Sequence, residues 1–166
     1  MKRVLILALS GLCAAAGTGQ TDIKSAGTTV IESSQEGARI VVKIETHELD
    51  IGNSSAGPPK TPRSSSCTYS RHPCALVDRV EIRVNDRNLF IPRSAFCDLA
   101  DLNTANLLMH ADKYVLHLFG GDGAESYVVD IQFSASRITG RTVASATRKG
   151  QPLETTTYHP DADDVN

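Results

Sequence analysis

The chain has 166 residues, a formal net charge of −2 and few aromatic residues, none of them tryptophan. This length corresponds to a single domain. The slightly acidic charge gives no electrostatic reason to bind nucleic acid or an anionic membrane surface, and the scarcity of aromatic rings argues against a stacking platform for bases or sugars.

The N-terminus predicts a cleavable secretion signal over residues 1–16. Lys2 and Arg3 precede an apolar run over residues 4–13, and small residues follow. A charged segment, an apolar segment and a small-residue cleavage site are, in this order, the pattern of a signal peptide. We place the cleavage after Ala16 and expect a periplasmic or secreted protein.

Two other interpretations of the N-terminus fit less well. The apolar run is about half the length that a membrane-spanning helix requires. A lipoprotein signal places a small residue before the lipidated cysteine, whereas Leu12 precedes Cys13 here. No later apolar stretch is long enough to cross a bilayer, so we expect no membrane span. Residues 17–27 are small and polar, and they predict a flexible leader.

Residues 28–158 predict a single β domain. Short runs of β-branched or alternating apolar residues recur between polar and glycine-containing turns. We expect an all-β antiparallel meander that forms a small barrel or a strongly curved sheet or sandwich. Ser94 is predicted to cap one short helical turn, and the acidic tail at 159–166 should be loose. The predicted strands cover residues 28–33, 38–46, 76–84, 89–91, 105–110, 113–119, 126–133, 138–145 and 153–158.

Residues 52–66 differ from the strands, because Gly, Ser and Pro dominate and alanine is their only apolar residue. They predict a long loop, for which we favour disorder over a functional role. Signal cleavage leaves three cysteines, so at most one internal disulfide forms and one thiol remains. We favour a Cys67–Cys74 disulfide with Cys97 as the remaining thiol. The alternative joins Cys67 or Cys74 to Cys97.

Two segments carry a resemblance to known sequences: Val84 to Leu99, and the glycine-rich stretch from Gly120 to Tyr127. With them, residues 76–158 resemble a group of short exported bacterial proteins of unassigned function. The resemblance implies a bacterial protein of the periplasm or the extracellular space. It transfers no catalytic residue, because the group offers none.

Two histidines are candidate metal ligands. His110 and His117 lie on one predicted hairpin. If residues 112 and 113 form its turn, residue 110 lies opposite 115 and residue 108 opposite 117. The two imidazoles would then be diagonal neighbours within reach of a shared metal ion. Solvent-facing polar side chains are the more common interpretation of this pattern, and we predict neither a metal site nor a cofactor.

The remaining motifs favour structural interpretations. Cys67, His72 and Cys74 lack a fourth zinc ligand, and export favours a disulfide loop over a cysteine nucleophile. The glycine-rich stretch 120–123 is followed by a strand rather than a helix, which favours a tight turn over a phosphate-binding loop. We assign no catalytic role to two acidic pairs, Glu125 with Asp130 and Asp98 with Asp101.

The sequence therefore predicts a non-enzymatic module that binds a protein, a peptide or a small apolar ligand. We expect the contacts at the loop 52–75 and at the turn 120–125, because loops on a rigid scaffold carry most binding residues. One alternative is a small hydrolase or metal-dependent enzyme that uses His110, His117 or the cysteine loop. The other is an envelope-assembly protein that pairs through an exposed strand edge.

Overall fold

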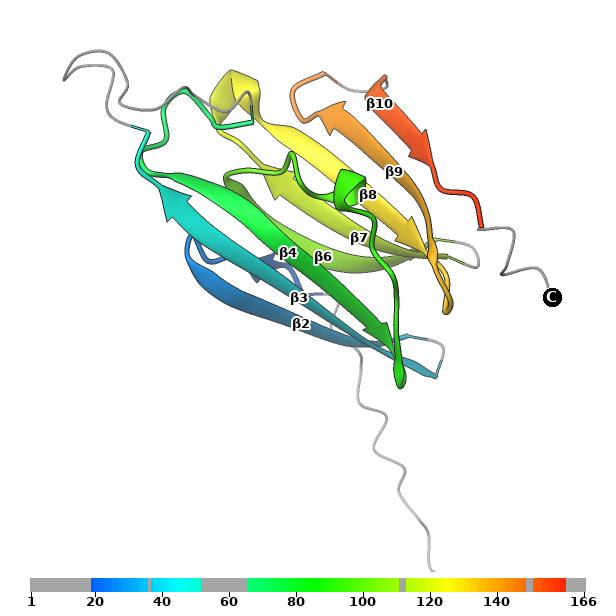
Figure 1. The fold of residues 1–166 in the computed structure, drawn as a ribbon. Helices are drawn as coiled ribbons and strands as arrows, with labels where there is room; N and C mark the ends of the chain where they lie inside the picture. The colour runs from blue at the N-terminus through cyan, green and yellow to red at the C-terminus, as the bar shows by residue number, and fades with distance from the viewer. Residues whose placement is uncertain (1–18, 36, 52–65, 111–112, 149–150, 161–166) are drawn as a thin grey trace, which may run out of the picture.

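The computed structural model describes residues 19–35, 37–51, 66–110, 113–148 and 151–160. Two antiparallel sheets pack face to face with their strands running in similar directions (Figure 1). The expectation of an all-β fold is confirmed in its sandwich form, because neither sheet closes into a barrel within the described residues. The predicted signal peptide and nearly all of the loop 52–66 lie outside these residues.

The four-stranded sheet forms from the first half of the domain. Its strand order is β2-β3-β4-β5, and each strand is antiparallel to its neighbours. Ile40, Val42 and Ile44 alternate along β3 and are fully buried, which is the period expected for a strand with one face on the core. The strands are β2 (Gly27–Gln35), β3 (Ala38–Leu49), β4 (Cys74–Val84) and β5 (Arg87–Asn88).

The six-stranded sheet contains the second half of the domain, in the order β1-β6-β7-β8-β9-β10. From β6 onward it is a simple meander, as the polar turns predicted. Strand β9 has the predicted bounds. The strands of the six-stranded sheet are β1 (Thr21–Asp22), β6 (Leu102–His110), β7 (Lys113–Gly120), β8 (Tyr127–Phe133), β9 (Ile138–Ser145) and β10 (Pro152–Thr157).

Part of the predicted flexible leader belongs to this sheet, so that prediction is wrong for residues 21–23. Thr21 pairs with Ala105 of β6. The Ile23 N–H donates to the Asn103 carbonyl at 2.9 Å, and the Ile23 side chain packs against the core. Pairing with β6 stabilises this segment in the sheet. The composition of the leader does not predict this pairing, because β6 is distant in the sequence.

Residues 89–101 connect the four-stranded sheet to the six-stranded sheet. This segment lies over β8 and β9, since Asp98 pairs with Arg141 and Ala100 bonds to Tyr127. Its helical turn is a 3-10 turn, η2 (Arg93–Ala95), with Pro92 rather than Ser94 at its N-terminus. The predicted cap is therefore wrong: Ser94 falls inside the turn, and its Oγ lies 3.3 Å from Tyr158 Oη.

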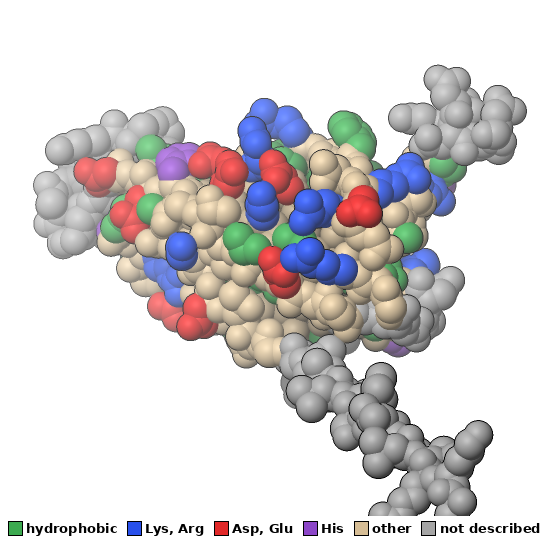
Figure 2. Space-filling model, turned by 90° about the horizontal axis from the view of Figure 1, so that it is seen from below, with side chains coloured by type: hydrophobic (Ala, Val, Ile, Leu, Met, Phe, Trp, Pro, Cys, Tyr) green, Lys and Arg blue, Asp and Glu red, His purple; other side chains and the backbone are tan. Residues whose placement is uncertain are grey.

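The outer surface of the four-stranded sheet carries several ion pairs. On the four-stranded sheet, Arg79 pairs with Glu81 and Glu45, and Arg39 pairs with Glu32. Seen from below, side chains of both charge signs are interspersed on the surface rather than gathered by sign (Figure 2). Such mixed charge keeps a surface solvated and disfavours nonspecific association.

Candidate functional site

The outer face of the six-stranded sheet carries a row of polar side chains. Inward positions along these strands are filled by residues such as Leu116, Leu118, Val129 and Ile131, all fully buried. The residues between them point away from the core, because successive side chains alternate across a strand. The register aligns one polar residue from each of five strands: Asn106, His117, Asp130, Thr142 and Thr155.

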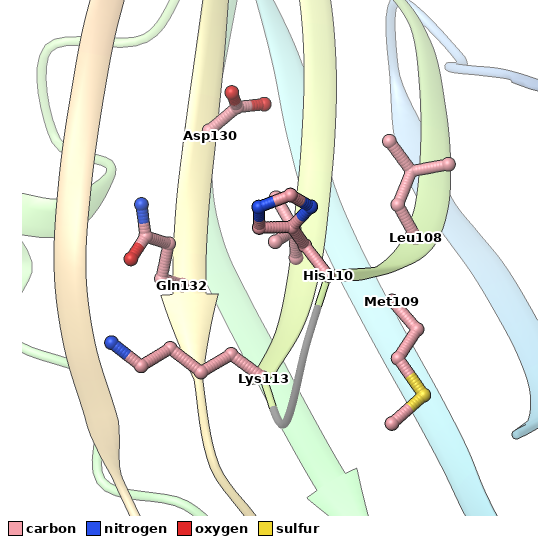
Figure 3. A pocket seen from close by; sticks show the side chains of 7 residues that line it. Leu108, Met109, His110, Lys113, Asp130 and Gln132 are labelled. Atoms are coloured by element: carbon pink, nitrogen blue, oxygen red, sulfur yellow. The ribbon is translucent and has the colours of Figure 1, made fainter. Parts of the chain in front are cut away.

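A pocket of about 520 Å³ opens beside this row (Figure 3). Leu108 and Met109 of β6 lie on one side of it, and Asp130 and Gln132 of β8 lie on the other. Val115 lines it as well, and His110 and Lys113 lie at the end of the β6–β7 hairpin. This volume falls in the range of small-molecule sites, which combine apolar walls with a few polar groups.

Within the polar row, His117 and Asp130 form a direct cross-strand pair. The two residues are opposite each other in the β7–β8 register, and His117 Nδ1 lies 2.6 Å from Asp130 Oδ1. Both side chains are somewhat more than one-third exposed. A carboxylate bound to one ring nitrogen orients the imidazole and fixes which nitrogen remains for other partners. The pattern of either strand alone does not reveal this pair, because it depends on the register between them.

Asn106 lies on the other side of His117 in the same row. Its Oδ1 is buried and has no hydrogen-bond partner in the part of the chain that the structure describes. A buried acceptor of this kind needs a water molecule or a ligand donor. Asn106 and Asp130 therefore place hydrogen-bond acceptors on both sides of the imidazole.

The predicted proximity of His110 and His117 is wrong. The β6–β7 register pairs His110 with Lys113, and it pairs Asn106 with His117. It is shifted by two residues from the expected one, which leaves the imidazoles about 13 Å apart along the hairpin. They do not share an ion. No group of three or more His, Cys, Asp or Glu residues within the described ranges is arranged to hold a metal.

At one end of the sandwich, the predicted disulfide is confirmed. Cys67 and Cys74 are bonded, which leaves Cys97 as a free, exposed thiol. His72 is exposed within the loop that they close. Because both loop sulfurs are in the disulfide, neither acts as a thiolate nucleophile in this state.

A buried carboxylate holds the disulfide loop in place. Asp101 is 1% exposed. Its Oδ2 accepts a hydrogen bond from the Thr68 N–H at 2.8 Å, and its Oδ1 accepts one from the Ala75 N–H at 2.9 Å. The residue adopts a positive φ of 50°, which Asp tolerates better than most residues. It thereby fixes both ends of the loop to the start of β6.

The turn after β7 meets the disulfide loop. It contains a 3-10 turn, η3 (Gly123–Glu125), between β7 and β8. The Tyr69 N–H donates to Glu125 Oε2 at 2.7 Å, and Ser70 Oγ lies 3.3 Å from Asp122 Oδ2. The loop and the turn that were predicted separately as contact regions thus form one surface. Residues 66–75 are the described part of the loop.

The carboxylates of the two acidic pairs considered in the sequence bind different partners. Asp98 and Glu154 bind the buried Arg141 guanidinium at 2.6 and 2.7 Å, whereas Asp101 binds backbone N–H groups. Glu125 accepts from Tyr69, and Asp130 binds His117. Each carboxylate has a partner of its own, which supports structural roles for them.

Tyr127 completes the packing at this end. Its hydroxyl donates to the Ala100 carbonyl and accepts from the Ala100 N–H. Burial raises the pKa of the Tyr127 hydroxyl to about 12, because the phenolate would be poorly solvated there. It borders a pocket of about 330 Å³ that Asp98, Glu125 and Arg141 also line.

Comparison of the chain with protein-family models, with curated proteins and with solved structures found no match. In the described part of the chain, no helix is long and apolar enough to cross a membrane. The assignment of function therefore rests on the geometry of the two regions above.

Proposed function

We propose that this protein is a non-enzymatic binding module of the periplasm or the extracellular space. It holds a small, mostly apolar ligand in the pocket on the outer face of β6, β7 and β8. The observation that carries the proposal is the composition of that pocket. Its apolar lining is Leu108, Met109 and Val115, and its polar lining is His110, Lys113, Asp130 and Gln132. Apolar walls supply most of the binding free energy, and the few polar groups select the ligand.

The polar groups define what the ligand carries. Asp130 is a carboxylate, and Asn106 offers an unpartnered acceptor next to His117. A ligand with an O–H or N–H group directed at this row would donate to Asp130, which lines the pocket, whereas Asn106 Oδ1 is buried and does not line it. Its apolar part would cover Leu108 and Val115, which are half-buried in the absence of a ligand.

Export is supported by two independent features. The N-terminal pattern is that of a signal peptide, and the Cys67–Cys74 disulfide is stable in oxidising compartments rather than in the cytosol. The resemblance of residues 76–158 to exported bacterial proteins agrees with both.

A dye-binding titration tests the proposed pocket. The probe is 1-anilinonaphthalene-8-sulfonate, whose fluorescence increases in apolar sites. We expect Val115→Asp to weaken binding by about tenfold or more, since it places a charge on the apolar lining. Leu153→Asp, at a side chain 68% exposed on β10, is the matched control and should leave binding unchanged. Equal effects of both variants, or no dye binding by the parent protein, would refute the pocket.

The His117–Asp130 pair favours a second candidate, an acid–base enzyme, because carboxylate-oriented imidazoles serve as general bases. The residues directly opposite His117 are Asn106 and Asp130, which supply neither a hydroxyl nor a thiol nucleophile. This candidate predicts hydrolysis of p-nitrophenyl acetate that His117→Ala abolishes. The binding module predicts no turnover above that of free imidazole.

A further inference from the structure

Within the described residues, the two sheets together present four edge strands: β1 and β10 in the larger sheet, and β2 and β5 in the smaller one. An edge strand exposes unpaired backbone N–H and C=O groups that can pair with another chain. Proteins that remain monomeric protect such edges by short strands, proline, bulges or charged side chains. The four edges of this molecule differ in that protection.

Three edges carry protective features. Strands β1 and β5 are each two residues long, too short to support an added strand. Strand β10 begins with Pro152, its register with β9 shifts between Pro152 and Glu154, and Glu154 turns inward to pair with Arg141. A proline, an irregular ladder and an inward charge each interrupt pairing.

Strand β2 carries only one of these features, a single charged side chain. It is nine residues long, contains no proline and pairs with β3 without a register shift, from Gly27 with Thr46 to Gln35 with Ala38. Its one charged residue, Glu32, forms an exposed ion pair with Arg39 at 2.9 Å. Val30 points outward and is 47% exposed. Long, regular and nearly uncharged edges of this kind are the ones that accept another strand.

We infer that β2 is the docking edge for a second copy of this chain. Two β2 strands pair antiparallel across a two-fold axis, which joins two four-stranded sheets into one continuous sheet of eight strands. Antiparallel self-pairing is an isologous contact, the commonest kind in homodimers. A sheet of eight strands is within the normal size range.

The pattern of β2 is complementary to itself. Side chains on the same face meet when the axis passes through Val30 or Ile31. In those registers Glu32 lies opposite Thr28 or Val30 of the partner subunit, so like charges are not placed directly opposite each other. Direct opposition of like charges therefore does not prevent the pairing of two copies, whereas an acidic residue of another partner placed opposite Glu32 would be repelled.

The dimer leaves the proposed ligand pocket open, because the pocket lies on the other sheet. The inference is thus independent of the proposed function. Loss of dye binding would not affect it, and a monomeric protein could still bind the dye.

Sedimentation velocity over a wide concentration range tests the inference. The parent protein should show a concentration-dependent dimer. Val30→Lys, which places two like charges near the axis, should raise the concentration of half-association by about tenfold or more. Leu153→Lys on the protected edge β10 is the matched control and should not change it. Since both side chains are largely exposed, we expect both variants to fold, which far-UV circular dichroism checks.

Hydrogen exchange supplies a second measurement on the same variants. Backbone amides of β2 should exchange more slowly as the concentration of the parent protein rises, and Val30→Lys should remove this dependence. A monomer at every concentration would overturn the inference. So would a dimer that Leu153→Lys disrupts and Val30→Lys does not.

Discussion

The disulfide-loop end and the outer face of β6–β8 differ in how their buried side-chain oxygen atoms are hydrogen-bonded. At the loop end, both carboxylate oxygens of Asp101 accept backbone hydrogen bonds, and the Tyr127 hydroxyl bonds twice to Ala100. On the β6–β8 face, Asn106 Oδ1 is buried beside an open pocket and has no partner among the residues that the structure describes. Satisfied polar groups stabilise one conformation, whereas a buried acceptor without a partner lowers the stability of the conformation that buries it. The first region is structural, and the second is where we propose that the ligand binds.

The largest effect that sharpens this contrast is expected at Asp101. Asp101→Ala should lower the free energy of unfolding by about 3 kcal/mol, because it removes two hydrogen bonds to a buried carboxylate and leaves two N–H groups unpaired. Urea denaturation measures the loss. Asp122→Ala, in the exposed turn next to it, should cost under about 0.5 kcal/mol. Similar losses for the two variants would mean that Asp101 does not hold the loop.

The next effect concerns alkaline pH. The folded protein holds the Tyr127 proton up to a pKa of about 12, whereas the unfolded chain loses it near 10. As pH rises, the hydroxyl deprotonates in the unfolded chain before it does so in the folded protein, which stabilises the unfolded state. The free energy of unfolding should therefore fall by about 2 kcal/mol from pH 10 to pH 12. Below pH 10 this contribution should be constant.

Tyr127→Phe isolates that contribution from the other groups that titrate at high pH. Its free energy of unfolding, followed by urea denaturation at each pH, should decline less steeply between pH 10 and pH 12 than that of the parent. Parallel curves for the two proteins would show that burial does not raise the pKa of this hydroxyl.

The disulfide at the same end of the molecule also contributes to the free energy of unfolding. Replacing both Cys67 and Cys74 by Ser should lower the free energy of unfolding by about 2 kcal/mol, chiefly because the unfolded chain becomes less restricted. Reduction of the parent protein should have the same effect. Cys97→Ser provides the control, because its exposed thiol contributes little to packing. A larger loss for Cys97→Ser than for the double variant would contradict the assigned pairing.

The smallest effect should have the opposite sign and lies on the β6–β8 face. Asn106→Leu removes a buried acceptor without a partner, so the free energy of unfolding should stay unchanged or rise by up to about 1 kcal/mol. Asn103→Leu is a matched control on the same strand. Asn103 Oδ1 accepts from Arg71, and its amide donates to Gly121. Asn103→Leu should therefore lower the free energy of unfolding by about 1 to 2 kcal/mol. Equal losses at both positions would remove the distinction between the two regions.

The sequence by itself determined the local elements. Alternating apolar residues predicted the strands, and β9 has the predicted bounds of Ile138–Ser145, because a strand with one buried face has a period of two. The short separation of Cys67 and Cys74 predicted their disulfide, since nearby cysteines close a loop at little entropic cost. Both depend on residues close together in the chain.

Only the tertiary structure decided how distant segments meet. Residues 21–23 lie against β6, and the strands form two sheets rather than a barrel. The β6–β7 register differs from the expected one, so His110 and His117 are far apart. The tertiary structure also brought His117 to Asp130 and fixed the disulfide loop through Asp101. A strand pattern states which face is buried but not which residue lies opposite, because ladder hydrogen bonds are the same in every register and packing against the other sheet selects among them.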